Sequence, residues 1–169
     1  DSHLPLVAVD DSLYRRLPCF IIATVDKFAA LPWVGETGAL FGKVQRHNGD
    51  GFYGPMETTT GTPIPGGCLP PPDLIIQDEL HLISGPLGTI AGIYETAIEA
   101  LCLRKGQNGT EVRPKIVAST ATVRRANRQI RALFGRAETA VFPSPGINRT
   151  DSFFAQTIPV SEKQPGRVY

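Results

Sequence analysis

The chain has few cysteines, no long apolar run and almost no excess charge. Its three cysteines, Cys19, Cys68 and Cys102, are odd in number and widely spaced, which argues against a disulfide framework. It contains no signal peptide, acylation motif or apolar run long enough to span a bilayer, so we expect no membrane partner and take the cytoplasm as the default location. The formal net charge of +1 indicates that the chain as a whole does not attract nucleic acid by charge.

The 169 residues also lack the phosphate-loop pattern Gly-x-x-x-x-Gly-Lys-Ser/Thr. That loop supplies the backbone amides and the lysine that hold the β- and γ-phosphates of a nucleoside triphosphate. We therefore expect the isolated chain neither to bind nor to hydrolyse ATP. The composition, 41% hydrophobic and 20% charged, otherwise fits a globular domain with one core.

The most informative segment that is present covers residues 72–82. The apolar residues 74–76 show no polar alternation, which predicts a parallel strand covered on both faces. Asp78 and Glu79 follow at the carboxyl end of this strand, where open α/β sheets place ligands. Because adjacent side chains diverge, one acid can hold Mg²⁺ while the other orients or deprotonates an attacking water.

A second segment, residues 115–122, repeats the pattern of an apolar strand that ends in hydroxyl residues, here Thr120 and Thr122. Between the two segments, residues 87–103 carry apolar side chains at helical spacing, which predicts a strand, helix and strand unit. Such a crossover makes the two strands parallel and puts both carboxyl ends at one edge of the sheet. We therefore expect the threonines to lie near His81.

These residues carry a resemblance to a known family. Residues 78–81, Asp-Glu-Leu-His, resemble motif II of superfamily 2 helicases, and residues 120–122, Thr-Ala-Thr, resemble their motif III. Residues 21–29 resemble the strand and loop that touch the nucleic-acid backbone in these motors. A longer similarity is to the helicase-like subunit of DISARM-type phage-defence systems, over residues 74–95, 142–146 and 152–155.

The resemblance implies an α/β fold: a partial RecA-like domain of the P-loop NTPase type, with a parallel sheet and flanking helices but without the phosphate-loop strand. It implies that Asp78 coordinates Mg²⁺ and that Glu79 positions the attacking water. His81, with Thr120 and Thr122, would couple the state of the nucleotide to the grip on nucleic acid.

The resemblance further implies that Thr24 and Lys27 contact the nucleic-acid backbone. The implied cofactors of the full-length parent are ATP and Mg²⁺. The implied partners are nucleic acid, with DNA favoured over RNA, a second RecA-like domain of the same parent chain, and other subunits of the defence system. We expect the chain to be a fragment of such a motor protein, because it lacks both the phosphate loop and the arginine motif of the second domain.

We expect residues 1–143 to form the partial first domain, with a short strand in residues 4–9 and a strand followed by a short helix within residues 20–34. Residues 144–169 are expected to form a linker toward the second domain, since prolines at 143, 145, 159 and 165 discourage a helix. Residues 35–72, rich in Gly, Pro and Thr, are expected to be a poorly ordered insertion with a hairpin around residues 48–51.

Other interpretations stay open. The chain could be a non-catalytic nucleic-acid-binding or scaffold module with a relic ATPase fold, or a metal-dependent hydrolase that uses Asp78, Glu79, His81 and in one version His47.

Cys68 with His47 is weak evidence for zinc, and core packing is favoured for Cys19 and Cys102. Five arginines lie within residues 124–136 and could form a patch that binds nucleic acid. The favoured interpretation is instead that they lie on the solvated face of an amphipathic helix, whose inner side carries residues 130, 133 and 134. The five are Arg124, Arg125, Arg128, Arg131 and Arg136.

Overall fold

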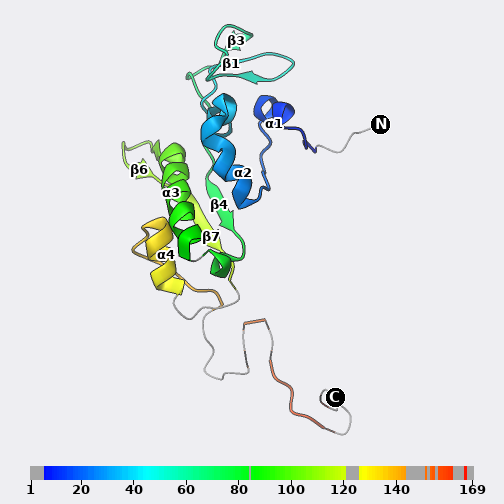
Figure 1. Ribbon diagram of the computed structural model, residues 1–169, viewed down its shortest axis with the longest axis vertical. Coiled ribbons are helices and arrows are strands. Elements are labelled where there is room, and N and C mark those ends of the chain that lie inside the picture. The colour runs from blue at the N-terminus through cyan, green and yellow to red at the C-terminus, as the bar shows by residue number, and fades with distance from the viewer. Residues whose placement is uncertain are drawn as a thin grey trace. The chain divides into compact units, whose positions relative to one another are not determined.

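The computed structural model describes residues 6–83, 85–120, 126–143, 151, 153–154, 156–161 and 166. The chain divides into two compact units, Asp1–Gly135 and Arg136–Tyr169. The first unit begins with short helices and a small sheet and continues with a parallel strand pair and two further helices (Figure 1). The elements that build the first unit are α1 (Asp10–Arg16), α2 (Val25–Ala30), η1 (Leu31–Trp33), η2 (Gly35–Phe41), β1 (Arg46–His47), β2 (Phe52–Tyr53), β3 (Thr62–Pro63), β4 (Leu74–Gln77), η3 (Leu80–Leu82), α3 (Gly85–Cys102), β5 (Arg104–Lys105), β6 (Glu111–Val112), β7 (Lys115–Ala118) and α4 (Ala126–Phe134).

Strands β4 and β7 pair in parallel, with Leu74 opposite Lys115 and Gln77 opposite Ala118. The chain passes from β4 through η3 and α3 to β7, so the predicted strand, helix and strand unit is confirmed. Because the pair is parallel, the carboxyl ends of β4 and β7 lie at the same edge. The hairpin of β5 and β6 is a short antiparallel addition between α3 and β7.

The core beneath this strand pair is formed by η3, α3 and α4. Helix α4 lies beside α3 in Figure 1, and its buried residues Leu133 and Phe134 join Ala91 of α3. Leu80, which is fully buried, is part of the same cluster. The predicted amphipathic character of α4 is confirmed, because its apolar residues face this core while Arg128 is exposed. Burial of each large apolar side chain contributes roughly 1.5–3 kcal/mol.

The outer face of the strand pair is open, which corrects the prediction that β4 is covered on both faces. Leu74 is 50% exposed, Ile76 is 57% exposed and Val117 is 45% exposed. Ile76 lies opposite Val117 in the register, so these side chains form one apolar strip. Elements η3, α3 and α4 pack against the other face, where Ile116 and Ala118 contact the core.

The segment 35–72 forms a small folded unit, so the prediction of poor order there is wrong. Its three strands pair antiparallel in the order β2, β1, β3. A second core, separate from the first, contains Ala39, Val44 and Ile64. Gly42 makes this packing possible, because it has a left-handed backbone (φ 75°) and a Cβ there would collide with the carbonyl of Leu69.

The predicted hairpin around residues 48–51 is confirmed. The side-chain oxygen of Asn48 accepts hydrogen bonds from the backbone amides of Asp50 (2.8 Å) and Gly51 (3.1 Å), which closes the turn between β1 and β2. Arg15 of α1 holds the hairpin from outside. Its guanidinium forms a salt bridge with Glu57 at 2.8 Å and a cation–π contact with Tyr53, 4.6 Å from the ring centre. The insertion is therefore held by its own turn and by a contact from α1.

Neither strand expected near the amino terminus is found in the described residues. Residues 6–9 and 20–24 are not in strands, and positions 4 and 5 lie outside the described residues. Ile22 is 86% exposed. Apolar character alone therefore does not produce a strand here, because no neighbouring strand among the described residues pairs with this segment.

In the second unit, the rings of Phe142, Phe153 and Phe154 contact one another, with centroid separations of 5.1–5.6 Å. The described residues of this unit include no helix. Over the described part of the whole chain, no helix has both the length and the apolar character needed to cross a membrane.

Candidate active site

Asp78 stands directly after β4, and its carboxylate is held in place from two sides. Oδ1 of Asp78 accepts hydrogen bonds from Oγ of Ser119 and from the backbone amide of Glu79 at 2.9 Å. These donors lower the pKa of Asp78 below its ordinary value of 3.8, with the Ser119 hydroxyl as the larger cause. Asp78 is therefore an ionised, exposed carboxylate at a strand end, which suits a ligand of a divalent cation.

Glu79 has a left-handed backbone, with φ 51° and ψ 43°, and precedes η3. This conformation is unfavourable for a residue with a Cβ by roughly 1–2 kcal/mol, so surrounding contacts must hold it. Oε2 of Glu79 lies 3.1 Å from Nδ1 of His81. Nδ1 is buried, and no described residue has the geometry to hydrogen-bond it, so its contact with Glu79 is an ion pair whenever the imidazole is protonated.

The backbone joins the ends of β4 and β7 beyond the strands themselves. The amide of Ser119 donates to the carbonyl of Gln77 at 2.9 Å, and the amide of Leu80 donates to the carbonyl of Ser119 at 2.9 Å. Thr120 follows Ser119 on this edge, while Thr122 lies outside the described residues. The strand ends are therefore neighbours as predicted, and direct contact of His81 with either threonine stays a prediction.

Two residues of this site were missed from sequence. Ser119 is the first hydroxyl residue after the apolar strand and lies one step beyond the Gln77 and Ala118 pair, so the register could have pointed to it. Gln129 of α4 donates to the backbone carbonyls of Leu80 and Ile83, both at 2.8 Å. No periodicity or motif in the sequence marks Gln129 for this contact.

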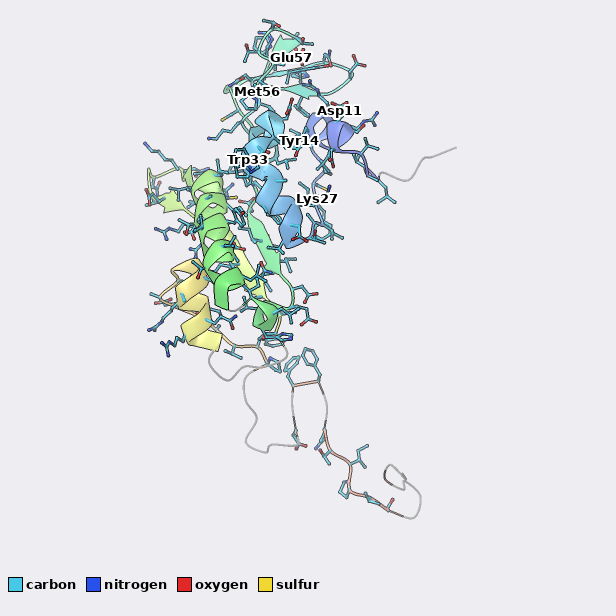
Figure 2. All side chains as sticks on the ribbon, viewed as in Figure 1. Asp11, Tyr14, Lys27, Trp33, Met56 and Glu57 are labelled. Carbon is cyan, nitrogen blue, oxygen red and sulfur yellow. The ribbon has the colours of Figure 1, made fainter. Side chains whose placement is uncertain are left out.

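Thr24 and Lys27, the residues expected to contact nucleic acid, lie at α2. Thr24 immediately precedes the helix and makes no capping hydrogen bond with its side chain. Lys27, labelled in Figure 2, is exposed and lies 4.0 Å from a carboxylate oxygen of Asp10. A pair this exposed is worth little in stability, so the ammonium group can exchange partners, and its contact with nucleic acid stays a prediction.

Metal binding by histidine and cysteine finds no support in the described residues. No group of three or more His, Cys, Asp or Glu side chains gathers there in a way that could hold a metal ion. Cys68 is exposed. His47 instead lies 3.5 Å from the hydroxyl of Thr62. Mg²⁺ has a different requirement, because one or two carboxylates together with substrate phosphates suffice, and Asp78 fits that role.

The remaining cysteines differ from each other. Cys102 is buried at the end of α3, as predicted, and burial raises the pKa of its thiol to about 11. Cys19 is exposed, so the prediction that it packs in a core is wrong. Its segment forms no strand, and the side chain therefore has no sheet to pack against.

No family model matches this chain. The sequence is 44% identical, over 177 aligned residues that include 99% of the chain, to the DISARM protein DrmA of Bacillus paralicheniformis (strain ATCC 9945a / NCIMB 11709 / CD-2). The chain spans 16% of the length of that protein. This confirms the resemblance to a DISARM protein that residues 74–95 first indicated. The chain is thus similar, along nearly its whole length, to one segment of a DISARM protein DrmA.

Proposed function

We propose that this chain is part of the first RecA-like motor domain of a phage-defence protein, in which Asp78 and Glu79 support ATP hydrolysis during movement along DNA. The similarity to a DISARM protein DrmA supports the role in phage defence. The ATPase role rests on the site. A phosphate loop and a second motor domain, which this chain does not carry, would come from the rest of the parent protein.

The observation that carries the proposal is the hydrogen bond from Ser119 to Asp78. It fixes an ionised carboxylate at the point where two adjacent parallel strands end. Open α/β sheets bind ligands at this edge, and among the described residues the Asp78 carboxylate accepts from a hydroxyl and a backbone amide, not from a basic side chain. Asp78 would hold Mg²⁺, and bound Mg²⁺ would neutralise charge on the phosphates.

Glu79 is suited to a different task. It follows Asp78 directly, yet its left-handed backbone and its contact with His81 give it separate surroundings. In the proposal its carboxylate accepts the proton of the attacking water while Asp78 stays ionised. His81, with Thr120 and Thr122, would pass the state of this site to the nucleic-acid contacts, for which Thr24 and Lys27 are the candidates.

The open face of the strand pair also supports a partial domain. Parallel sheets are normally covered on both faces, yet Leu74, Ile76 and Val117 leave an apolar strip exposed. In a parent about as long as DrmA, we propose that further strands and helices complete this sheet. The competing proposal, a binding or scaffold module with a relic ATPase fold, is favoured by the missing phosphate loop.

The test uses a chimaera in which this chain replaces the aligned segment of the Bacillus paralicheniformis protein. We call it the DrmA chimaera. We expect DNA-stimulated phosphate release that depends on Mg²⁺. Asp78→Asn should raise the Mg²⁺ concentration for half-maximal turnover by about tenfold or more, since the amide is a weaker cation ligand. The matched control is Asp73→Asn, because Asp73 is also exposed but pairs with Arg104 at the other end of β4.

Equal Mg²⁺ dependence in the two variants would contradict the role of Asp78. A chimaera that binds DNA and folds, but releases no phosphate while the parental DrmA does, would favour the scaffold proposal. Circular dichroism of each variant establishes that the comparison is made between folded proteins.

A further inference from the structure

The turn that carries Glu79 is held by α4 as well as by β7. Both contacts come from one side-chain amide: Nε2 of Gln129 donates at 2.8 Å to the carbonyl of Leu80 and at 2.8 Å to the carbonyl of Ile83. The two bonds use both hydrogens of that amide group. Gln129 is separated from Leu80 by 49 positions, so this is a tertiary contact and not a local feature of the helix.

These two carbonyls can accept more hydrogen bonds than η3 itself supplies. They lie at the start and just after the end of η3, a single turn of 3-10 helix, which offers few backbone donors. The carbonyl of Leu80 accepts from the amide of Ile83 at 3.1 Å and has capacity for one more donor. Leu80 and Ile83 are both buried, so water cannot easily replace Gln129.

Glu79 therefore lies between two anchors. Ser119 holds the start of the turn through the side chain of Asp78 and the amide of Leu80. Gln129 holds its end. A left-handed residue persists only where its neighbours fix it, and these anchors leave the segment little freedom to relax.

We propose that Gln129 is a positioning residue, which fixes the turn of Glu79 and His81 and makes α4 the element that sets the placement of the water-activating carboxylate. This inference rests on the proposed ATPase function and deepens it. Helix α4 is a rigid support for this purpose, because Leu133 and Phe134 of the same helix pack into the core that contains Leu80.

The first test is structural and uses this chain alone. Gln129→Met keeps the side-chain length but removes both donors. We expect the amides of Leu80, Leu82 and Ile83 to exchange hydrogen at least about tenfold faster, because the turn opens more often. The amide of Lys115, which bonds the carbonyl of Asp73 at 2.8 Å at the far end of the strand pair, should stay within about twofold.

Gln107→Met is the matched control, since Gln107 is exposed in the turn between β5 and β6. It should leave exchange unchanged at both places. Unchanged exchange at Leu80, Leu82 and Ile83 in the Gln129 variant would overturn the inference.

The second test measures turnover in the DrmA chimaera. Gln129→Met should lower kcat by about tenfold while the KM for ATP stays within about twofold, because the displaced carboxylate acts on the water and not on nucleotide binding. A raised KM with unchanged kcat would overturn the inference. The inference would also be overturned if Gln129→Met leaves kcat unchanged while Glu79→Gln lowers kcat strongly. That result would leave the proposed function standing. If neither variant lowers turnover while hydrogen exchange responds as expected, the proposed function fails and the catalytic part of the inference fails with it.

Discussion

Ser119 donates a hydrogen bond from its hydroxyl to the carboxylate of Asp78, 41 positions earlier in the chain. The two residues follow directly after β7 and β4, so this bond links the ends of neighbouring parallel strands. It also explains why Asp78 is ionised more readily than an ordinary aspartate. The acidic segment and the hydroxyl-rich segment, recognised separately in the sequence, therefore meet at one edge of the strand pair.

Removing this donor should change the acidity of Asp78. In Ser119→Ala, we expect the pKa of Asp78 to rise toward its ordinary value of 3.8, because the largest cause of its depression is gone. Titration of the Asp78 carboxyl carbon by NMR measures this. The matched control is Ser12→Ala on α1, away from Asp78 in the chain. A pKa of Asp78 that does not move in Ser119→Ala would show that the hydroxyl is not its partner in solution.

The same bond predicts how stability depends on pH. The folded-state pKa of Asp78 is lowered, so its contribution is present above the ordinary value of 3.8 and is lost as pH falls through the folded-state pKa. Ser119→Ala should therefore reduce the difference between the unfolding free energy at neutral pH and the unfolding free energy at a pH below the folded-state pKa of Asp78. Urea unfolding at both pH values measures the effect, and an unchanged difference would count against this linkage.

The cysteines should separate into two classes of reactivity. Cys19 and Cys68 are exposed, whereas Cys102 is buried and has a pKa raised to about 11. Because the thiolate is the reactive form, a chromogenic disulfide reagent at neutral pH should modify two thiols quickly and Cys102 only after denaturation. Cys102→Ala should leave the fast phase intact. Fast reaction of all three thiols in the native chain would show that α3 does not bury Cys102.

The insertion should be separable from the strand pair. The core of Ala39, Val44 and Ile64 shares no buried residue with the core that contains Leu80. Replacing residues 45–66 with a short Gly/Ser linker should therefore preserve cooperative unfolding of the β4 and β7 core, since the cost of loop closure changes slowly with length. Hydrogen exchange at the Leu80 amide follows that core. Loss of protection there would mean that the insertion supports it.

The sequence predicted the parts of this structure in which local pattern and tertiary contact agree. Residues 74–76 form a strand, the apolar spacing after them forms α3, and the inner residues of α4 face the core. Residues 20–24 have a similar apolar character but no described strand beside them. Segment 35–72 has many glycines and prolines, yet a few apolar residues such as Val44 and Ile64 suffice for a small core.

The candidate site was predicted where adjacent residues carry the chemistry, as at Asp78 and Glu79. It was missed where a contact depends on the approach of distant elements. Ser119 could be found only once the strand register was known. Gln129 could be found only once α4 was placed against η3, because one amide on an amphipathic helix has no local signature.

The decisive measurement for the proposed role of Glu79 is the turnover of Glu79→Gln in the DrmA chimaera. The amide keeps the shape of the side chain but cannot accept the proton of the attacking water, so DNA-stimulated turnover should fall by about a hundredfold or more while nucleotide binding is retained. Glu111→Gln on β6 is the matched control and should retain turnover within about twofold. If Glu79→Gln also retains turnover within about twofold, which is less than ~0.5 kcal/mol on the activation barrier, Glu79 is not the water-activating group and the account is contradicted.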